Sequence, residues 1–215
     1  MVTPDTAPGV NYSGGLVYVS DLEGKITKVN LTNMPDDGAG NRIKLYDQTT
    51  LFTAGSTKAN GRYMYHSMDA TVGDSTNSMW LFAGTGDYER INDTGTKKRK
   101  PDNLMLGIRD KNYPYYKDIG KPLQANNLSD CEDTTGNVPG SACIDQAKEG
   151  WYIKLKDSAK VTAEPTVFRG YVKCNFKIFI ANKCSNRKSR ANQRSFRYIC
   201  FRNCTIKWCS DRKLF

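Results

Sequence analysis

The alternation of apolar and polar residues along the chain predicts short β-strands separated by turns. Its clearest unit is the segment Leu16 to Asn30. Leu16 to Ser20 is a run of β-branched and aromatic residues, and Lys25 to Asn30 mixes polar and apolar positions at a period close to two. Between them, Asp21 and Gly24 suit the first and last positions of a tight turn. The pattern predicts a β-hairpin with Asp21 and Gly24 in its turn.

Similar runs recur along the chain, with glycine, proline or aspartate beside them. They predict further strands at residues 78–83, 104–109, 151–155 and 166–172. No stretch combines the apolar stripe and the capping residues of an amphipathic helix. Short strands with many turn residues are typical of sandwiches, barrels and propellers. The sequence therefore predicts an all-β fold.

Long polar segments separate the predicted strands and are candidate interaction loops. They are Thr32 to Asn41, Asn92 to Asp102 and Gln124 to Glu149. The last contains Cys131 and Cys143, which are 12 positions apart. In an oxidising compartment these two cysteines could close a loop worth on the order of 3 kcal/mol. The alternative is two unrelated thiols.

Charge and cysteine content divide the chain near residue 172. Residues 171–215 hold 12 Lys and Arg, one acidic residue and five of the seven cysteines, but neither glycine nor proline. The first 170 residues hold 20 basic and 21 acidic residues, so the net charge of +10 comes from the C-terminal part. We therefore expect a body at 1–172 and a basic, cysteine-containing tail at 173–215.

Three interpretations of the tail remain open. The simplest is out-of-frame translation or a premature junction, which would leave a disordered segment without a selected structure. The second is nucleic-acid binding, since basic residues alternate with aromatic ones, although charge runs are usually only solvated. The third is a metal or disulfide module. The tail has no Cys-x-x-Cys pair and no histidine, so zinc is disfavoured.

His66 is the single histidine, and the pattern His66-Ser67-x-Asp69 invites comparison with a hydrolase. Adjacent residues on a strand point to opposite faces, and nothing around Ser67 resembles a nucleophile elbow. We therefore expect a structural role for these residues and no catalytic residue. Carboxylates at 36–37 and 130–133 do not match an EF-hand loop and are expected in solvated turns.

Six motifs, taken in order, resemble the C-terminal β-propeller domain of the PilY/PilC family, the tip-associated adhesins and assembly factors of type IV pili. The resemblance covers roughly residues 10–172. The motifs are Tyr18–Gly24 (YVSDLEG), Leu51–Ala54 (LFTA), Trp80–Tyr88 (WLFAGTGDY), Leu106–Asp110 (LGIRD), Gly150–Leu155 (GWYIKL) and Val161–Val172 (VTAEPTVFRGYV).

The resemblance implies a partial, quinoprotein-like propeller that is not an enzyme. A blade takes about 40–45 residues, so the body holds about four blades' worth of chain, and we expect a fragment truncated before Met1 and disrupted after about Val172. The implied partners are pilus subunits, other pilus-tip proteins, and a host or abiotic surface. The implied location is extracellular, at the pilus tip or outer-membrane surface. The chain itself shows no signal peptide, and its longest apolar run has five residues, so no transmembrane segment is expected.

The resemblance also implies a calcium ion bound just before the strand at 16–20. The corresponding stretch, Asp5 to Gly15, supplies one carboxylate and one side-chain amide, whereas calcium takes six to eight oxygen ligands. We therefore assign no metal or cofactor residue and expect that none is required. The alternative function is a quinoprotein-type dehydrogenase, whose blades share the hairpin pattern. Its chemistry needs cofactor contacts, a metal and a carboxylate in one pocket, and no residue cluster suggests them.

Overall fold

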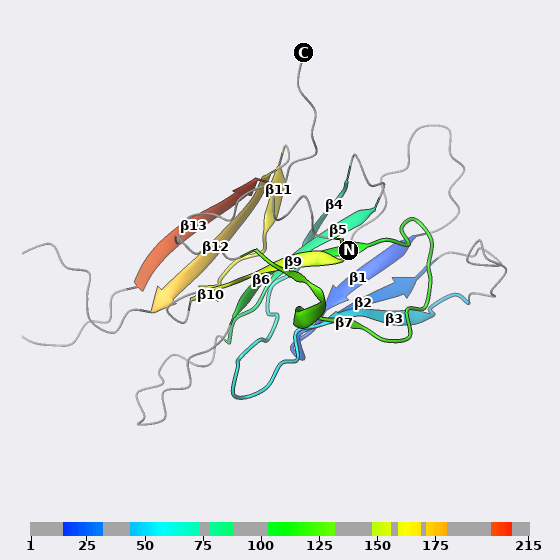
Figure 1. Ribbon diagram of the computed structural model, residues 1–215, viewed down its shortest axis with the longest axis horizontal. Coiled ribbons are helices and arrows are strands. Elements are labelled where there is room, and N and C mark those ends of the chain that lie inside the picture. The colour runs from blue at the N-terminus through cyan, green and yellow to red at the C-terminus, as the bar shows by residue number, and fades with distance from the viewer. Residues whose placement is uncertain are drawn as a thin grey trace, which may run out of the picture.

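The computed structural model describes residues 15–31, 44–73, 78–87, 103–131, 148–155, 159–168, 171–179 and 199–207. Their regular structure consists of β-strands and one short 3-10 helix, η1 (Ala125–Asn127). The strands form three hydrogen-bonded sheets (Figure 1). Within these residues the all-β prediction is confirmed. None of the helical structure described is long and apolar enough to cross a membrane.

The first sheet contains the predicted hairpin. Its spatial order is β1 (Leu16–Ser20), β2 (Lys25–Asn30), β3 (Gln48–Thr53) and β7 (Leu123–Gln124). The first three strands are antiparallel, and the short β7 runs parallel to β3. The sheet is therefore mixed and is completed by a segment that lies 70 positions after β3 in the sequence.

The turn between β1 and β2 depends on Asp21 and Gly24. The Gly24 N–H donates to the carbonyl of Asp21 at 3.0 Å, and the Lys25 N–H donates to Asp21 Oδ1 at 2.9 Å. Gly24 has a φ of 71°, in the left-handed region that favours glycine. A Cβ atom on Gly24 would also lie 2.6 Å from the carbonyl oxygen of Arg62. Both the backbone conformation and the neighbouring chain therefore require glycine at this position.

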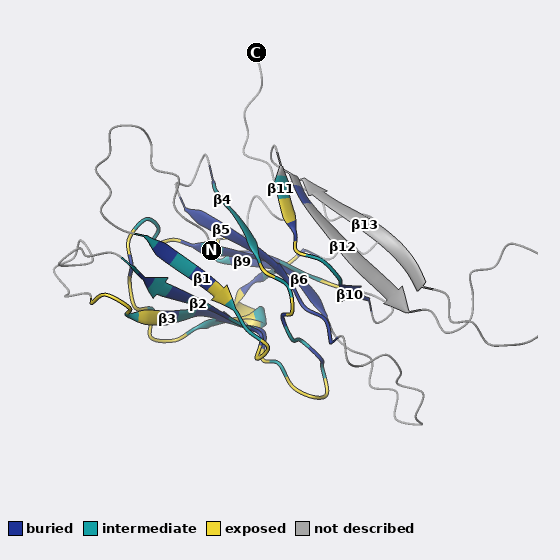
Figure 2. Cartoon of the chain, turned by 180° about the vertical axis from the view of Figure 1, so that it is seen from behind, coloured by how far each residue is buried: buried dark blue, intermediate teal, exposed yellow. Residues whose placement is uncertain are grey.

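The second sheet lies between the other two in both views of the chain (Figures 1 and 2). Its spatial order is β4 (Asp69–Val72), β5 (Met79–Gly84), β6 (Leu104–Asp110), β9 (Gly150–Lys154) and β8 (Ser129–Asp130). All neighbours are antiparallel except β8, which is parallel to β9. The chain passes between these two sheets three times, from β3 to β4, from β6 to β7, and through η1 from β7 to β8.

The third sheet is built around β12 (Tyr171–Phe179). One edge of β12 pairs with β10 (Lys160–Val161) and β11 (Thr166–Phe168), and the other pairs with β13 (Ile199–Lys207). β12 therefore crosses the boundary that composition suggested at residue 172, and β13 lies inside the predicted tail. The origin of the tail as coding sequence stays a prediction.

The second sheet is buried on both faces, which explains its continuous apolar sequence. On β5, Met79 and Leu81 pack against the first sheet, whereas Trp80 and Phe82 pack toward the third sheet. Every residue of β5 is buried, and Figure 2 shows this strand in dark blue. Strands covered on both sides lose the alternation of half-exposed strands, because both sets of side chains leave water. Apolar burial on the two faces therefore holds the three sheets together.

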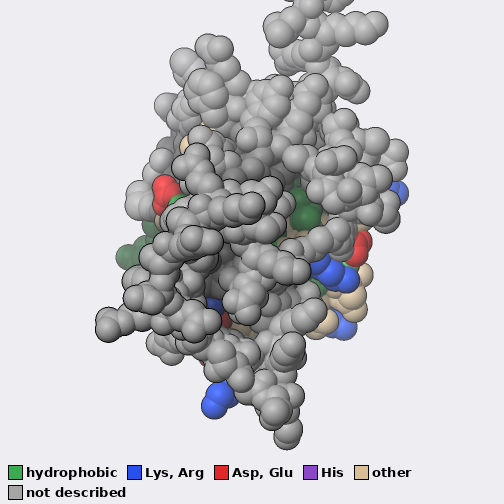
Figure 3. Space-filling view, turned by 90° about the vertical axis from the view of Figure 1, so that its left-hand side faces the viewer, with side chains coloured by type: hydrophobic (Ala, Val, Ile, Leu, Met, Phe, Trp, Pro, Cys, Tyr) green, Lys and Arg blue, Asp and Glu red, His purple; other side chains and the backbone are tan. Residues whose placement is uncertain are grey.

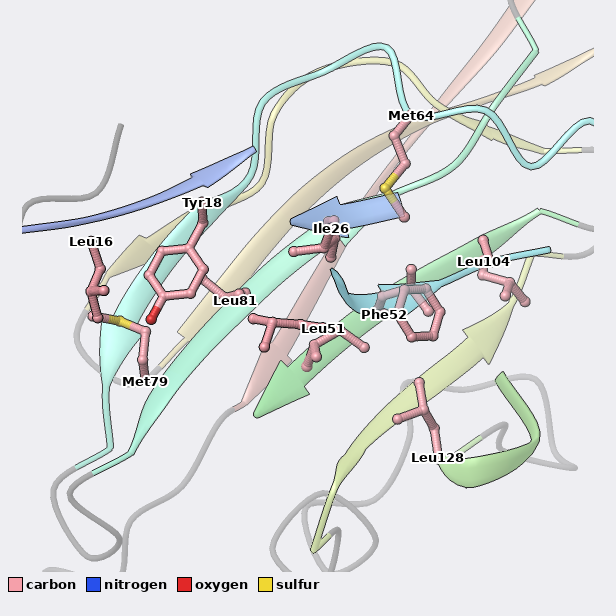
Figure 4. Packing of buried hydrophobic residues seen from close by; sticks show 14 of the residues in the cluster. Leu16, Tyr18, Ile26, Leu51, Phe52, Met64, Met79, Leu81, Leu104 and Leu128 are labelled. Carbon is pink, nitrogen blue, oxygen red and sulfur yellow. The ribbon is translucent and has the colours of Figure 1, made fainter. Parts of the chain in front are cut away.

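Two apolar clusters make up the core. The larger fills the space between the first and second sheets and is shown in Figure 4. It includes Leu16, Ile26, Phe52, Leu81 and Leu104, all of them almost completely buried. The smaller lies between the second and third sheets around Trp151.

Some elements were not predicted from the sequence. β4 was missed, and its four residues are all half-buried, which gives no clear alternation. The predicted loop at 124–149 contains η1 and β8, which are too short to leave a sequence pattern. The number of propeller blades stays a prediction, because the described residues form three sheets that do not close a ring.

We expect Gly107→Ala to destabilise the fold. Gly107 lies opposite Trp151 in the pairing of β6 with β9, and a Cβ on Gly107 would lie 2.4 Å from Trp151 Cε2. Overpacking of this kind typically costs about 1–3 kcal/mol. The measurement is the free energy of unfolding in urea. Gly15→Ala is the matched control, because nothing lies within 4 Å of its added Cβ. Equal stability of the two variants would contradict the packing of Trp151 on Gly107.

Candidate functional site

A groove of about 330 Å³ runs beside β1, the edge strand of the first sheet in the described part of the chain. Two segments line it. They are residues 17–20 of β1 and residues 64–68, which precede β4. The Ser20 hydroxyl donates to the carbonyl of His66 at 3.3 Å and joins the two segments. The groove therefore contains the single histidine of the chain.

The polar residues of the His66-Ser67-x-Asp69 pattern have separate hydrogen-bond partners. The Ser67 hydroxyl donates to Glu164 Oε2 at 2.5 Å, across 97 positions of sequence. Asp69 Oδ2 accepts the backbone N–H of Val167 at 2.6 Å, and Asp69 Oδ1 accepts that of Ala70 at 2.8 Å. Ser67 and Asp69 thus tie the second sheet to the loop before β11 and to β11 itself.

Burial lowers the pKa of His66, and the nearby Glu164 carboxylate partly opposes this effect. The imidazole is therefore neutral over a wider pH range than a free histidine. A neutral His66 beside an exposed Ser67–Glu164 hydrogen bond gives the groove a polar but weakly charged wall.

A buried ion pair lies next to the groove and shares Tyr18 with it. Lys28 Nζ lies 2.6 Å from Asp110 Oδ2, and the two side chains are 0% and 1% exposed. The Tyr18 hydroxyl donates to the same oxygen at 2.7 Å, and the Asn112 N–H donates to Asp110 Oδ1 at 3.0 Å. Lys28 Nζ also donates to the carbonyl of Tyr115 at 2.6 Å. The network joins β1 and β2 of the first sheet to β6 of the second.

The segment after β6 covers this ion pair and is anchored to the first sheet. The Thr49 hydroxyl donates to Asp118 Oδ1 at 2.9 Å, and the same oxygen accepts the Gly120 N–H at 2.9 Å. These hydrogen bonds lower the pKa of Asp118. Tyr116 is buried beside them, and burial, together with the charges of Asp118 and Asp47, raises its pKa to about 12. The cover is therefore held by specific contacts and separates Lys28 from solvent.

A second buried polar cluster lies where β5 ends and β6 begins. The Thr85 hydroxyl accepts the Leu104 N–H at 2.8 Å, and Asn103 Nδ2 donates to the carbonyl of Ala159 at 2.9 Å. The buried Lys160 side chain donates to the carbonyl of Asp87. These contacts join the second sheet to β10, so the cluster has a structural explanation.

The other sequence-predicted sites are only partly described. Cys131 is disulfide-bonded, whereas Cys143 lies outside the described residues, so the Cys131–Cys143 pairing stays a prediction. Of the implied calcium loop, residues 5–15, only Gly15 is described. The loops 32–41 and 92–102 lie entirely outside the described residues. Within the described segments, no group of three or more His, Cys, Asp or Glu side chains is placed to hold a metal ion.

Charged side chains do not form one patch on the face drawn in Figure 3. Lys and Arg side chains of the described residues lie there as separate spots, with Asp and Glu side chains between them.

Comparisons with known proteins give a weak likeness to a solved structure. No family model matches the chain, and no curated protein matches it. Among solved structures, the chain is similar to the crystal structure of the Pseudomonas aeruginosa PilY1 C-terminal domain, with a TM-score of 0.48 and 12% identity. The match covers 75% of this chain but only 40% of that chain. The likeness concerns the fold alone and establishes neither family membership nor function.

We expect His66 to destabilise the folded protein in acid. Because burial lowers its pKa below the ordinary value of 6.5, the unfolded chain binds the proton more readily than the folded one. Stability is therefore lost as the pH falls from about 7.5 to about 5.5. His66→Gln should remove this part of the loss. The measurement is the urea midpoint of both proteins at both pH values, and an equal loss in the two would contradict the assignment.

We expect peptide mapping without reduction to find Cys131 joined to Cys143. The structure places Cys131 in a disulfide, and Cys143 is its nearest cysteine in sequence. Cys143→Ser should free the thiol of Cys131, whereas Cys184→Ser should leave it blocked. A Cys131 peptide joined to any tail cysteine would refute the pairing.

Proposed function

We propose that the chain is a non-enzymatic part of a type IV pilus tip adhesin or pilus assembly factor. It acts by presenting loops of a partial β-propeller to pilus subunits, to other pilus-tip proteins, or to a host or abiotic surface. The observation that carries the proposal is the order of the six PilY/PilC-like motifs, each of which coincides with strands or turns of the three sheets.

The architecture supports a presenting role. Both faces of the second sheet are occupied by neighbouring sheets, so the scaffold offers its loops and edges for contacts. Binding residues are often placed on loops held by a rigid scaffold, because the scaffold reduces the entropy that binding must remove. The candidate segments are still the long polar loops 32–41, 92–102 and 124–149.

The disulfide at Cys131 supports a location outside the cytoplasm. Structural disulfides persist in oxidising compartments such as the periplasm and the cell surface. The partners of Ser67, Asp69 and Lys28 support the non-enzymatic assignment, since each of these groups has a contact that stabilises the fold. Calcium binding remains a proposal that rests on the family resemblance.

The test measures binding of the purified full chain to purified type IV pilus subunits by biolayer interferometry at physiological salt. The loop variant replaces Lys97, Lys98, Arg99 and Lys100 by serine, which removes the charge run of the 92–102 loop. The matched control replaces Arg187, Lys188, Arg190 and Arg194 in the tail, and so removes the same charge.

We expect the loop variant to bind at least about tenfold more weakly, equivalent to about 1.4 kcal/mol, and the tail variant to bind like the parent chain. Failure of the parent chain to bind pilus subunits and a solid surface would overturn the proposal. An equal loss in both variants would show that net charge, and not the loop, drives the interaction.

A further inference from the structure

The buried contact between Lys28 and Asp110 brings an amine against a carboxyl group inside the protein. Lys28 belongs to β2 of the first sheet and Asp110 ends β6 of the second, 82 positions away. Lys28 Nζ lies 2.6 Å from Asp110 Oδ2, so it is in van der Waals reach of the carbon that bears this oxygen. We propose that Lys28 and Asp110 form a side-chain amide bond, a covalent cross-link between the first and second sheets.

The surroundings of Lys28 favour the neutral amine that such a bond requires. An ammonium group has three N–H donors, and within the described residues Lys28 Nζ has two oxygen acceptors, Asp110 Oδ2 and the Tyr115 carbonyl. The Tyr18 ring, whose centroid lies 5.9 Å from Nζ, is an aromatic face and offers no oxygen acceptor to the third N–H, although it attracts the charged form. Burial lowers the pKa of Lys28, although Asp110 opposes this. A proton that moves from Nζ to Oδ2 turns two buried charges into two neutral groups without changing the total charge.

The surroundings of Asp110 hold the carboxyl group in one position. The Asn112 N–H donates to Oδ1 at 3.0 Å, where it would stabilise negative charge that develops on this oxygen during attack. The Tyr18 hydroxyl donates to Oδ2 at 2.7 Å, where it would assist the departure of this oxygen. Each oxygen thus has its own donor, and the amine is placed beside the group it would attack.

The reaction balances without another reagent. The lone pair of Nζ attacks Asp110 Cγ, a C–N bond forms, and the bond from Cγ to Oδ2 breaks. Oδ2 leaves as water with two protons that started on the Lys28 ammonium group, and the third proton stays on the amide nitrogen. Neither an oxidant nor a cofactor is consumed. The product joins β2 to β6, so the two sheets could no longer separate on unfolding.

The test is mass spectrometry of the folded full chain after prolonged incubation at neutral pH, followed by denaturation and full reduction of disulfides. We expect the intact mass to fall by the mass of one water molecule. After trypsin, we expect no cleavage at Lys28 and a branched peptide that contains both Lys28 and Asp110. A folded parent chain that is cleaved normally at Lys28 and gives no branched peptide would overturn the proposal.

Two variants distinguish the cross-link from other reactions that also lower the mass by one water molecule. Cyclisation of an aspartate to a succinimide also releases water, but Lys28→Arg would not prevent it. Lys28→Arg keeps the positive charge and cannot form the amide, so it should restore the full mass. Tyr18→Phe keeps both reacting groups and should lower the cross-linked fraction at a given time. A mass loss that persists in Lys28→Arg, without a branched peptide in the parent chain, would contradict the proposal.

Discussion

Burial of the second sheet on both of its faces is the constraint on which the other features of the structure depend. β5 and β6 send alternate side chains into two different apolar clusters, so neither neighbouring sheet can move without exposing one of them. Gly107 provides the space for the Trp151 ring between the second and third sheets. Hydrogen bonds of Asp69, Ser67 and Asn103 then hold the segments around β10 and β11 of the third sheet against the second sheet.

The ion pair of Lys28 and Asp110 adds a specific contact to this non-directional packing. Apolar surfaces tolerate sliding, whereas an ammonium group and a carboxylate inside the protein must remain together, because breaking a buried pair typically costs about 3–5 kcal/mol. The pair therefore selects one position of the first sheet on the second. Tyr18 extends this effect to the groove, since it lines the groove and also donates to Asp110.

A fold of this kind separates stability from recognition. Its stability comes from the stacked sheets, and loops carried by such a scaffold can vary in sequence. The proposed role at a pilus tip uses this separation, because an adhesive surface has to change with its target while the scaffold stays the same. The groove beside β1 is a concave surface lined by residues 17–20 and 64–68, and its wall is only weakly charged.

The sequence by itself determined the secondary structure class, the strands β1, β2, β5, β6, β9 and β11, and the turn at Asp21 and Gly24. These features depend on neighbouring residues, namely β-propensity, apolar runs and the freedom of glycine at positive φ. Only the tertiary structure decided that Lys28 points inward on the same face as Ile26, because its partner Asp110 comes from another sheet. For the same reason Ser67 hydrogen-bonds to Glu164 and Asp69 to Val167, almost 100 positions away in the sequence, and the two residues do not hydrogen-bond to each other. Local patterns report which residues can form a strand, but the partner of a buried charge depends on which distant strands pack together.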